Sequence, residues 1–369
     1  MAQKSYYRAM KNSNTVILHD AFGFKGGGER LVKILCRDLK ADLAFGYRNK
    51  NTFNLDELPN KLIDLDSESI LPVWRTFKRL HTFSNKTKFL NEYKNVIYTG
   101  YNSPLAVSNH SKGKNIYYCF TPPRAVYDLK EFHLKPQSPS KKVSHLLYNF
   151  FYQPLYENSI RKMDVILADS KNVQKRIHKF LGLESKLVYP PCDIDKFSWM
   201  GQEDYYLSTA RLTPYKRVDI IIEAFTKLPK KRLIVTSTGP EEKKLKQLAE
   251  GFTNIQFTGD IDDNELKNLI GNSIATIYIP KDEDFGMSPV ESMAAGKPVI
   301  GSGEGGLLET VVHRETGWLS SPKISVEELV QMLNSVNPKL AHSMRLSCEK
   351  QALSFRTEIF INKIKNTLS

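Results

Sequence analysis

Short apolar runs alternate along the chain with segments in which apolar residues recur every three to four positions. Such runs are typical of buried strands, and the longer period is typical of helices that cover a sheet. The alternation predicts an α/β protein with parallel sheets and crossover helices. The expected strands are Thr15–His19, Asp42–Phe45, Asn95–Tyr98, Ile116–Phe120, Asp164–Ala168, Tyr205–Thr209, Arg232–Thr236, Asn254–Phe257, Ala275–Ile279, Pro298–Ile300 and Gly317–Leu319. The clearest expected helices are Glu29–Leu39, Lys171–Leu181, Arg217–Lys227, Glu241–Glu250, Asp263–Ile270 and Ser288–Ala295.

The length of 369 residues predicts two domains, because a typical domain has roughly 100–200 residues. Two prolines at Tyr189-Pro190-Pro191 break regular structure. We therefore expect one doubly wound domain over residues 1–192 and a second over 193–353. The tail, residues 354–369, has apolar residues on one helical face, with Ile361 off that stripe. The stripe consists of Phe355, Ile359, Phe360, Ile364 and Leu368.

The net charge of +13 is confined to the first half of the chain. Residues 1–195 contain 31 Lys and Arg against 18 Asp and Glu, whereas residues 196–369 contain 22 of each. An anionic partner, such as a membrane surface, a phosphorylated acceptor or nucleic acid, would explain the imbalance. A solvated lysine-rich surface would explain it equally well. No helix-turn-helix, RNA-binding or zinc motif supports nucleic acid.

The chain has no apolar run long enough to span a membrane, and Met1–Asn14 is polar and basic, unlike a secretory signal. The four cysteines lack metal-binding or disulfide spacing, which favours free thiols in a reducing compartment. These features predict a cytoplasmic protein, with peripheral contact at an anionic membrane as an open alternative.

The richest segment is Pro280–Gly301, which consists of a strand end, a glycine loop, a helix and a second strand. Loop N–H groups and the helix start can hold a diphosphate without metal. Glu283 and Glu291 lie eight positions apart, and carboxylates suit hydrogen bonds from sugar and ribose hydroxyls. Two glutamates alone would be more typical of solvated side chains at an ordinary turn.

This segment resembles the Glu-x7-Glu signature of glycosyltransferase family 4, the large retaining GT-B group. The resemblance implies two Rossmann-like domains facing a central cleft, with Glu283 on the donor sugar and Glu291 on the ribose. It implies further donor contacts at Phe285, Gly286, Met287, Ser288 and Val290. In that fold the last helix crosses back onto the first domain, which we expect of residues 354–369. The resemblance covers nearly the whole chain and is most specific from Asp204 to Gly317.

Three other segments of the second half fit the same interpretation. Arg211 and Lys216 lie five residues apart after a strand, so that they can converge on one diphosphate and offset its charge. They resemble the Arg-x4-Lys pair of the family and complete, with Glu283, the expected catalytic set. Gly239 and Ile261 each follow a strand, at turns that the family uses to hold the base.

The first half carries looser motifs. Asp20 ends a strand, and Gly27 and Gly28 open the next helix, where the run resembles the Gly-Gly-Gly-Glu-Arg loop of mannosyltransferases. Residues 118–124 resemble a Cys-His-Thr-Pro-x-Arg motif, with Phe120 in place of the histidine. Phe120 has no side-chain hydrogen bond to offer, so backbone atoms, His19 or His110 would have to compensate, or the donor differs. Arg124 and Asp20 are candidate phosphate or acceptor contacts.

The resemblance therefore implies a metal-independent hexosyltransferase that uses a nucleotide-sugar donor, with GDP-mannose indicated by the two mannosyltransferase-like segments. A UDP-sugar, another GDP-sugar or a role as a weakly active partner subunit stays open. The expected acceptor is a glycan or a lipid-linked saccharide. We expect no cofactor beyond the donor and no metal.

Overall fold

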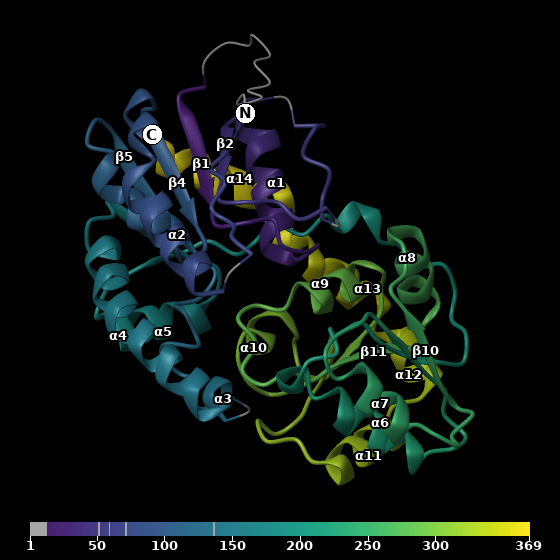
Figure 1. Cartoon of the computed structure of the whole chain (residues 1–369). Coiled ribbons are helices and arrows are strands. Elements are labelled where there is room, and N and C mark those ends of the chain that lie inside the picture. Colours follow the sequence, from purple (N-terminus) through teal and green to yellow (C-terminus); the bar gives the residue numbers. More distant parts are fainter. Residues whose placement is uncertain (1–12, 51, 59, 71, 136) are drawn as a thin grey trace. The chain divides into compact units, whose positions relative to one another are not determined.

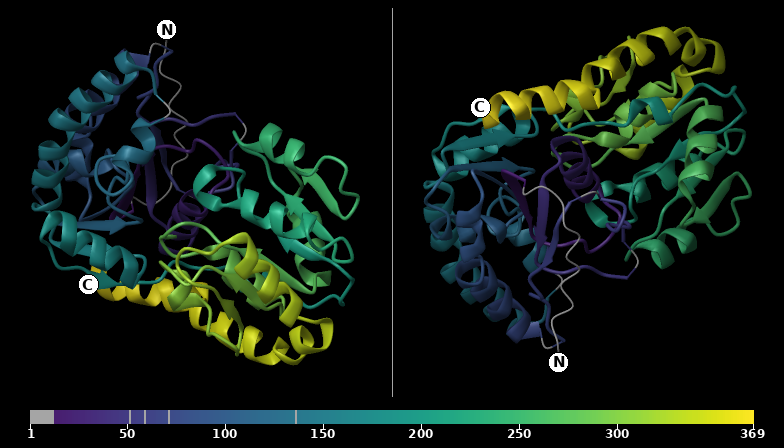
Figure 2. Two further views of the ribbon diagram at one scale, coloured as in Figure 1. Left: turned by 90° about the horizontal axis from the view of Figure 1, so that it is seen from below. Right: turned by 90° about the horizontal axis from the view of Figure 1, so that it is seen from above.

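The computed structural model describes residues 13–50, 52–58, 60–70, 72–135 and 137–369. Most of the polar segment Met1–Asn14 therefore lies outside the described residues. The chain divides into unit 1, Met1–Tyr189 with Phe360–Ser369, and unit 2, Pro190–Ile359. Each unit is described below by itself, and Figures 1 and 2 show its sheet with helices packed against it.

Unit 1 contains a seven-stranded parallel sheet in the order β3-β2-β1-β4-β5-β6-β7. Its strands are β1 (Thr15–His19), β2 (Asp42–Phe45), β3 (Leu62–Asp64), β4 (Asn95–Thr99), β5 (Lys114–Cys119), β6 (Val165–Ala168) and β7 (Lys186–Leu187). Its helices are α1 (Gly27–Leu39), α2 (Pro72–Asn85), α3 (Lys130–Leu134), α4 (Pro139–Ile160) and α5 (Lys171–Leu181), with 3-10 helices η1 (Lys88–Glu92) and η2 (Ser103–Asn109).

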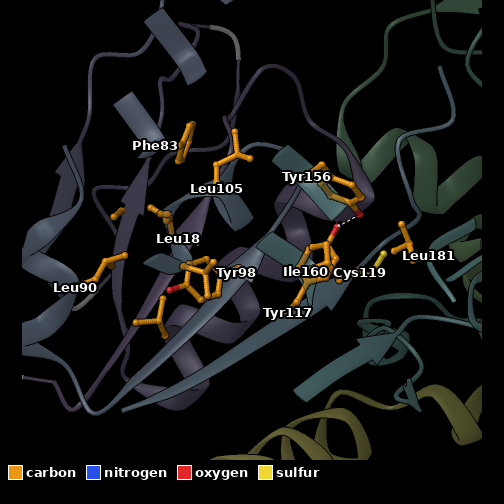
Figure 3. Close-up of a cluster of buried hydrophobic side chains, with 14 of the residues drawn as sticks. Leu18, Phe83, Leu90, Tyr98, Leu105, Tyr117, Cys119, Tyr156, Ile160 and Leu181 are labelled. Carbon is orange, nitrogen blue, oxygen red and sulfur yellow. Dashed lines mark hydrogen bonds between the residues drawn. The ribbon is translucent and has the colours of Figure 1, made fainter. Parts of the chain in front are cut away.

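Alternate residues of these strands point to opposite faces of the sheet, and both faces are buried, as parallel sheets require. Leu18 and Tyr98 join the cluster beneath α2, α4 and α5, where the Tyr117 and Tyr156 hydroxyls lie 3.0 Å apart (Figure 3). Ile17 joins the cluster of the other face, beneath α1 and α14 (Thr357–Leu368). The sheet is therefore covered by helices on both sides (Figure 1).

Unit 2 contains a six-stranded parallel sheet in the order β10-β9-β8-β11-β12-β13. Its strands are β8 (Tyr206–Ser208), β9 (Leu233–Thr236), β10 (Ile255–Gly259), β11 (Ala275–Tyr278), β12 (Val299–Gly301) and β13 (Gly317–Leu319). Its helices are α6 (Val218–Thr226), α7 (Glu242–Leu248), α8 (Asp263–Asn272), α9 (Met287–Ala294), α10 (Leu307–Thr310), α11 (Val326–Ser335), α12 (Pro338–Ser343) and α13 (Arg345–Ala352). Its 3-10 helices are η3 (Ile194–Lys196), η4 (Pro214–Lys216) and η5 (Leu353–Phe355).

The predicted α/β class and the two doubly wound parallel sheets are confirmed. The C-terminal helix differs in detail from its prediction. Helix α14 begins at Thr357, because Leu353–Phe355 forms η5. Ile361, predicted to lie off the apolar stripe, is buried in unit 1, whereas Ile359 is 42% exposed.

Candidate functional site

The order of strands changes direction in unit 2 where β8 pairs with β11, since β9 lies on one side of this pair and β12 on the other. Ligands of open parallel sheets bind outside the carboxyl ends of the strands at such a switch point. The loops that follow β8 and β11 carry the charged residues that the sequence analysis selected. The switch point is therefore where the candidate site is built.

Lys216 and Glu283 meet at this edge although 67 positions separate them. The Lys216 ammonium donates to both carboxylate oxygens of Glu283, at 2.9 and 2.7 Å, and to the Tyr278 hydroxyl at 2.7 Å. The Tyr278 hydroxyl in turn donates to Glu283 at 3.0 Å, which closes a three-membered cluster. Only 13% of the Lys216 side chain and 18% of the Glu283 side chain are exposed. The ion pair is thus shielded from water but not sealed from it.

The environment holds Lys216 in its charged form. Burial by itself would lower its pKa, but the Glu283 carboxylate and the Tyr278 hydroxyl outweigh burial and raise the pKa above the ordinary 10.5. Burial and Glu283 raise the pKa of Tyr278, so that its hydroxyl keeps its proton. At neutral pH the cluster therefore consists of a charged ammonium, Lys216, paired with the Glu283 carboxylate and a neutral phenol.

Arg211 and Lys216 begin and end one tight turn after β8. The Thr213 N–H donates to the Arg211 carbonyl at 2.8 Å, and the Lys216 N–H donates to the Thr213 carbonyl at 2.9 Å. The Arg211 side chain is exposed, whereas the ammonium of Lys216 is directed at Glu283. The structure thus places the two predicted cations on the same turn, and it adds a carboxylate partner to Lys216.

The loop between β11 and α9 exposes backbone rather than side chains. Gly286 has a φ of +93°, in the region that glycine tolerates, and it is the N-cap of α9. Because glycine has no side chain, Gly286 does not cap the first turn of α9, where Met287 and Ser288 have N–H groups that can face an anion and Pro289 has none. Phe285 is buried and packs against the Phe355 ring at 5.3 Å, so its side chain fixes the loop.

Glu291 lies in α9, with 8% of its surface exposed. The neighbouring Ser292 fastens this helix to the sheet, because its hydroxyl lies 2.8 Å from the Thr276 hydroxyl of β11. Among the other predicted contacts, Val290 is fully buried, and Met287 and Ser288 are partly exposed on the first turn. The helix therefore positions one carboxylate, Glu291, and the loop before it positions the other, Glu283.

The glycine-rich loop Ser302–Gly306 after β12 was not among the predicted site residues. The Gly306 N–H donates to the Glu283 carbonyl at 2.8 Å, and the Ser302 hydroxyl donates to the Pro280 carbonyl at 2.8 Å. A Cβ on Gly305 would lie 2.5 Å from the Glu283 carbonyl oxygen. Three glycines in four positions at a strand end are the signal that could have indicated this close backbone approach. The loop therefore holds the backbone of Glu283 in place.

Gly239 and Ile261, the predicted base contacts, lie at the ends of β9 and β10. Gly239 approaches the β8 loop so closely that a Cβ would lie 2.4 Å from the Leu212 carbonyl oxygen. Ile261 is partly exposed in the connection before α8. A surface depression of about 630 Å³ begins at Gly239 and Pro240 and continues along α7, away from the Lys216 cluster.

Unit 1 has its own switch point, between β1 and β4. The Asp20 carboxylate accepts hydrogen bonds from the backbone N–H groups of Tyr101, Asn102 and Ser103 at 2.6 to 2.9 Å. Asp20 therefore holds the start of η2. Gly27 and Gly28 form the first residues of α1, and the Phe120 ring lies where a Cβ of Gly28 would come within 3.2 Å.

The two histidines that could compensate for Phe120 lie in different surroundings. Both ring nitrogens of His110 are engaged, by Asn115 at 2.8 Å and by the Tyr93 carbonyl at 3.0 Å. His19 bonds to Thr99 through Nδ1 at 2.9 Å, and its Nε2 is buried without a hydrogen-bond partner. Burial lowers the pKa of His19 against the opposing charge of Asp20.

Arg124 is held within unit 1 by a carboxylate of its own loop. Its guanidinium donates to Asp128 at 2.8 and 3.0 Å, and the buried Arg176 lies 3.9 Å from the same carboxylate. Arg176 also donates to Thr121 at 2.9 Å, which ties the loop after β5 to α5. Among the residues that the structure describes, no three His, Cys, Asp or Glu side chains form a metal site.

Residues 193–351 match the sequence family described as glycosyl transferases group 1. Among curated proteins, the alpha-1,3/1,6-mannosyltransferase ALG2 of Dictyostelium discoideum is 38% identical over 97 residues, which cover 26% of this chain and 23% of that protein. The human GDP-Man:Man(3)GlcNAc(2)-PP-Dol alpha-1,2-mannosyltransferase is 25% identical over 246 residues, covering 58% of this chain and 50% of that protein. The chain thus spans about half, or less, of the length of these relatives.

Solved structures match almost the whole chain. Sucrose-phosphate synthase of Thermosynechococcus elongatus superimposes with a TM-score of 0.80 at 16% identity, covering 96% of this chain and 98% of that one. Anabaena HepE, solved with UDP and glucose, superimposes with a TM-score of 0.75 at 18% identity over the same shares of the two chains. At these identities the likeness establishes the fold, which is the GT-B fold expected above.

Proposed function

We propose that this chain, whose residues 193–351 match the glycosyl transferases group 1 family, is a metal-independent retaining hexosyltransferase. The proposed reaction moves mannose from GDP-mannose to a hydroxyl of a saccharide or a lipid-linked saccharide. The observation that carries the proposal is the Lys216–Glu283–Tyr278 cluster at the β8–β11 switch point. The chemistry of these groups matches each part of such a donor.

The leaving group of the reaction is a nucleoside diphosphate, whose charge grows as the glycosidic bond breaks. Lys216, with Arg211 on the same turn, can stabilise that charge, and so can the N–H groups at the start of α9. A diphosphate would attract the Lys216 ammonium and free part of the Glu283 carboxylate. Glu283 would then accept hydrogen bonds from hydroxyls of the transferred sugar, and Glu291 from the ribose.

In this proposal the acceptor hydroxyl attacks the anomeric carbon from the face that the phosphate leaves. The new glycosidic bond forms as the old carbon–oxygen bond breaks, and the acceptor proton passes to a phosphate oxygen. No protein side chain forms a bond to the sugar. Trapping a glycosyl adduct on Glu283 or on any other carboxylate would refute this account.

The choice of donor rests on relatives rather than on side chains at the site. Several matching curated proteins are named as mannosyltransferases, and the names of the human and mouse proteins include GDP-Man. Anabaena HepE, by contrast, was solved with UDP-glucose. A UDP-sugar or another GDP-sugar is therefore the alternative donor. The excess of Lys and Arg in the first half of the chain supports two further proposals. The acceptor is a lipid-linked saccharide, and the protein is cytoplasmic and contacts an anionic membrane peripherally.

The deciding experiment follows donor hydrolysis by proton NMR, with a panel of GDP- and UDP-sugars in the presence of a chelator. Release of α-mannose from GDP-mannose, without added metal, is the expected result. Glu283→Gln should reduce the rate by orders of magnitude. Lys227→Ala, which removes an exposed lysine paired with Glu327, should leave the rate unchanged. Hydrolysis of a UDP-sugar alone would replace the donor and keep the reaction class.

A weakly active partner subunit is the second candidate, and Phe120 is the observation that favours it. The ring lies over Gly28 at the start of α1, where a histidine would bring a hydrogen-bonding group. Phe120→His should raise hydrolysis of the preferred donor about tenfold if this position limits the rate. Binding of no donor by the wild-type chain would favour the partner subunit over the enzyme.

A further inference from the structure

Helix α4 of unit 1 is apolar on two opposite faces. Its inner face packs into the core through Tyr152, Tyr156 and Ile160. Its outer face carries large apolar side chains at the spacing of one helical stripe, and each of them is exposed. These residues, which we call the α4 outer face, are Val143, Leu146, Leu147, Phe150, Phe151 and Leu155.

A helix on the surface of a globular protein normally has one apolar face, which is buried, and polar residues on the opposite face. Here Phe150 is 73% exposed and Phe151 is 63% exposed, and α4 runs along the outside of unit 1 in Figures 1 and 2. Single exposed apolar residues are common, but a contiguous stripe of this length marks an interaction surface. Helix α2, which also packs on η2, carries the exposed Trp74 and Phe77. Exposed apolar residues are thus concentrated in this part of unit 1.

The charge around the α4 outer face identifies its partner. From Phe132 to Ile160 the sequence contains three lysines and one acidic residue, Glu157, which accepts hydrogen bonds from Tyr127 and Gln153. Lys141 and Lys142 lie in the first turn of α4, immediately before the apolar stripe. An apolar stripe beside lysines, with aromatic side chains among the apolar ones, is the pattern of a helix that lies in the headgroup region of an anionic bilayer.

The helix would lie on the bilayer rather than cross it. Among the residues that the structure describes, no helix is long and apolar enough to span a membrane. The inner face of α4 is committed to the protein core, and Pro154 interrupts its backbone hydrogen bonding. Only one face is therefore available to lipid.

We propose that the α4 outer face, with Lys141 and Lys142, docks this protein onto a membrane surface rich in anionic phospholipid. This proposal gives the membrane partner of the proposed function a defined surface, and it can be tested without any sugar transfer. The aromatic and aliphatic side chains enter the region just below the headgroups. The lysines contact the phosphates above them.

The test is sedimentation of the full chain with phosphatidylcholine vesicles, with and without phosphatidylglycerol. The wild-type chain should bind the mixed vesicles and bind those of phosphatidylcholine alone more weakly. Replacing Phe150 and Phe151 together by serine should weaken binding to the mixed vesicles at least about tenfold. The matched control is Leu346→Ser, which changes a 76% exposed leucine of unit 2 and should bind like the wild type.

A second pair of variants tests the contribution of Lys141 and Lys142 to binding of anionic phospholipid. Replacing Lys141 and Lys142 together by serine should weaken binding about tenfold and reduce its dependence on salt. The same change at Lys112 and Lys175, two exposed lysines of unit 1 outside α4, should have little effect. Circular dichroism and donor hydrolysis in the absence of vesicles separate a loss of docking from a loss of folding or of the proposed activity.

Two results would overturn the proposal. The first is equal vesicle binding by the wild type and the Phe150/Phe151 variant, or binding by neither of them. The second is a wild-type dimer in analytical ultracentrifugation that the same variant converts to monomer without any vesicle binding. That result would assign the α4 outer face to a second copy of the chain.

Discussion

The two sheets of this protein both change strand order at a switch point, yet they use it differently. In unit 2 the loops after β8 and β11 are joined by an ion pair, Lys216 with Glu283. In unit 1 the end of β1 is held by neutral groups, since His19 bonds to the Thr99 hydroxyl and Asp20, the next residue, accepts from backbone N–H groups. Both sheets therefore have a switch point at the carboxyl ends of their strands, and the side chains there determine which of the two can bind a charged ligand.

The two switch points differ in how they hold their carboxylates, Asp20 in unit 1 and Glu283 in unit 2. Asp20 accepts from three consecutive backbone N–H groups, which precede and begin η2. Glu283 accepts from a lysine side chain and a tyrosine hydroxyl, which can turn toward a ligand at little cost. A carboxylate bound by side chains is exchangeable, whereas one bound by backbone is part of the fold. The predictions below test this distinction, beginning with the largest effect.

Removing the Lys216 ammonium should have the largest effect on donor hydrolysis. Lys216→Ala should lower donor hydrolysis by at least about a hundredfold, because the leaving diphosphate loses a buried positive charge. It also leaves Glu283 without its cationic partner, so thermal stability should fall modestly. NMR of donor hydrolysis and thermal unfolding measure the two effects. An unchanged hydrolysis rate would show that the ion pair only joins the two loops.

The backbone support of Glu283 should have the next largest effect. Gly305→Ala places a Cβ 2.5 Å from the Glu283 carbonyl oxygen at a φ of +63°, so the Glu283 backbone must move. Donor hydrolysis should fall at least about tenfold, as expected of a displaced catalytic group. Gly251→Ala is the matched control, since its φ is +84° but nothing lies within 4 Å of the new Cβ. It should cost only backbone strain, about 1 kcal/mol, and leave hydrolysis intact.

Removing the Asp20 carboxylate should lower the stability of the fold and leave donor hydrolysis unchanged. Asp20→Ala leaves the N–H groups of Tyr101, Asn102 and Ser103 without their acceptor and should cost about 2 kcal/mol in the free energy of unfolding. Denaturant unfolding measures this cost, and Asp56→Ala, at an exposed carboxylate, is the control. Intact stability with a marked loss of transfer would instead make Asp20 an acceptor contact.

The smallest expected effect concerns pH and His19. Burial holds the pKa of His19 below its ordinary value of 6.5, so the unfolded chain takes up a proton at a pH where the folded chain does not. Folding stability contributed by the neutral ring is therefore lost as the pH falls below about 6.5. His19→Gln should reduce the difference in melting temperature between about pH 7.5 and about pH 5. His178→Gln, at an exposed histidine, should leave that difference unchanged.

The strands show which parts of the fold can be predicted from local pattern. The predicted bounds of β1 and β2 equal the observed ones, because each is a short apolar run buried in a parallel sheet. The bounds of β13 were also predicted correctly, although it lies at the edge of its sheet and only Gly317 is buried. Strands β3 and β7 were missed, since they lie at the sheet edges, are only partly buried and contain three and two residues. Helix α4 was missed as well, because its apolar residues occupy two faces and conceal the helical period.

The same limit applies to the site. The spacing of Glu283 and Glu291, and of Arg211 and Lys216, is local, so these residues could be selected from the sequence as a candidate set. Their roles toward a donor remain predictions. The contact between Lys216 and Glu283 was not predicted, and neither was the hydroxyl of Tyr278 between them. Their partners come from different strands, and pattern carries no information about which strands become neighbours.

By itself, the sequence determined the α/β class, most strands and their helices, and the match of residues 193–351 to the glycosyl transferases group 1 model, because each depends on residues close together in the chain. Only the tertiary structure decided that Lys216 pairs with Glu283 and that Asp20 accepts hydrogen bonds from backbone N–H groups at the start of η2. It also decided that one apolar face of α4 is exposed. These contacts depend on strand order and on packing between distant segments. Burial and pairing are properties of that three-dimensional arrangement, and they decide which charges a ligand can reach.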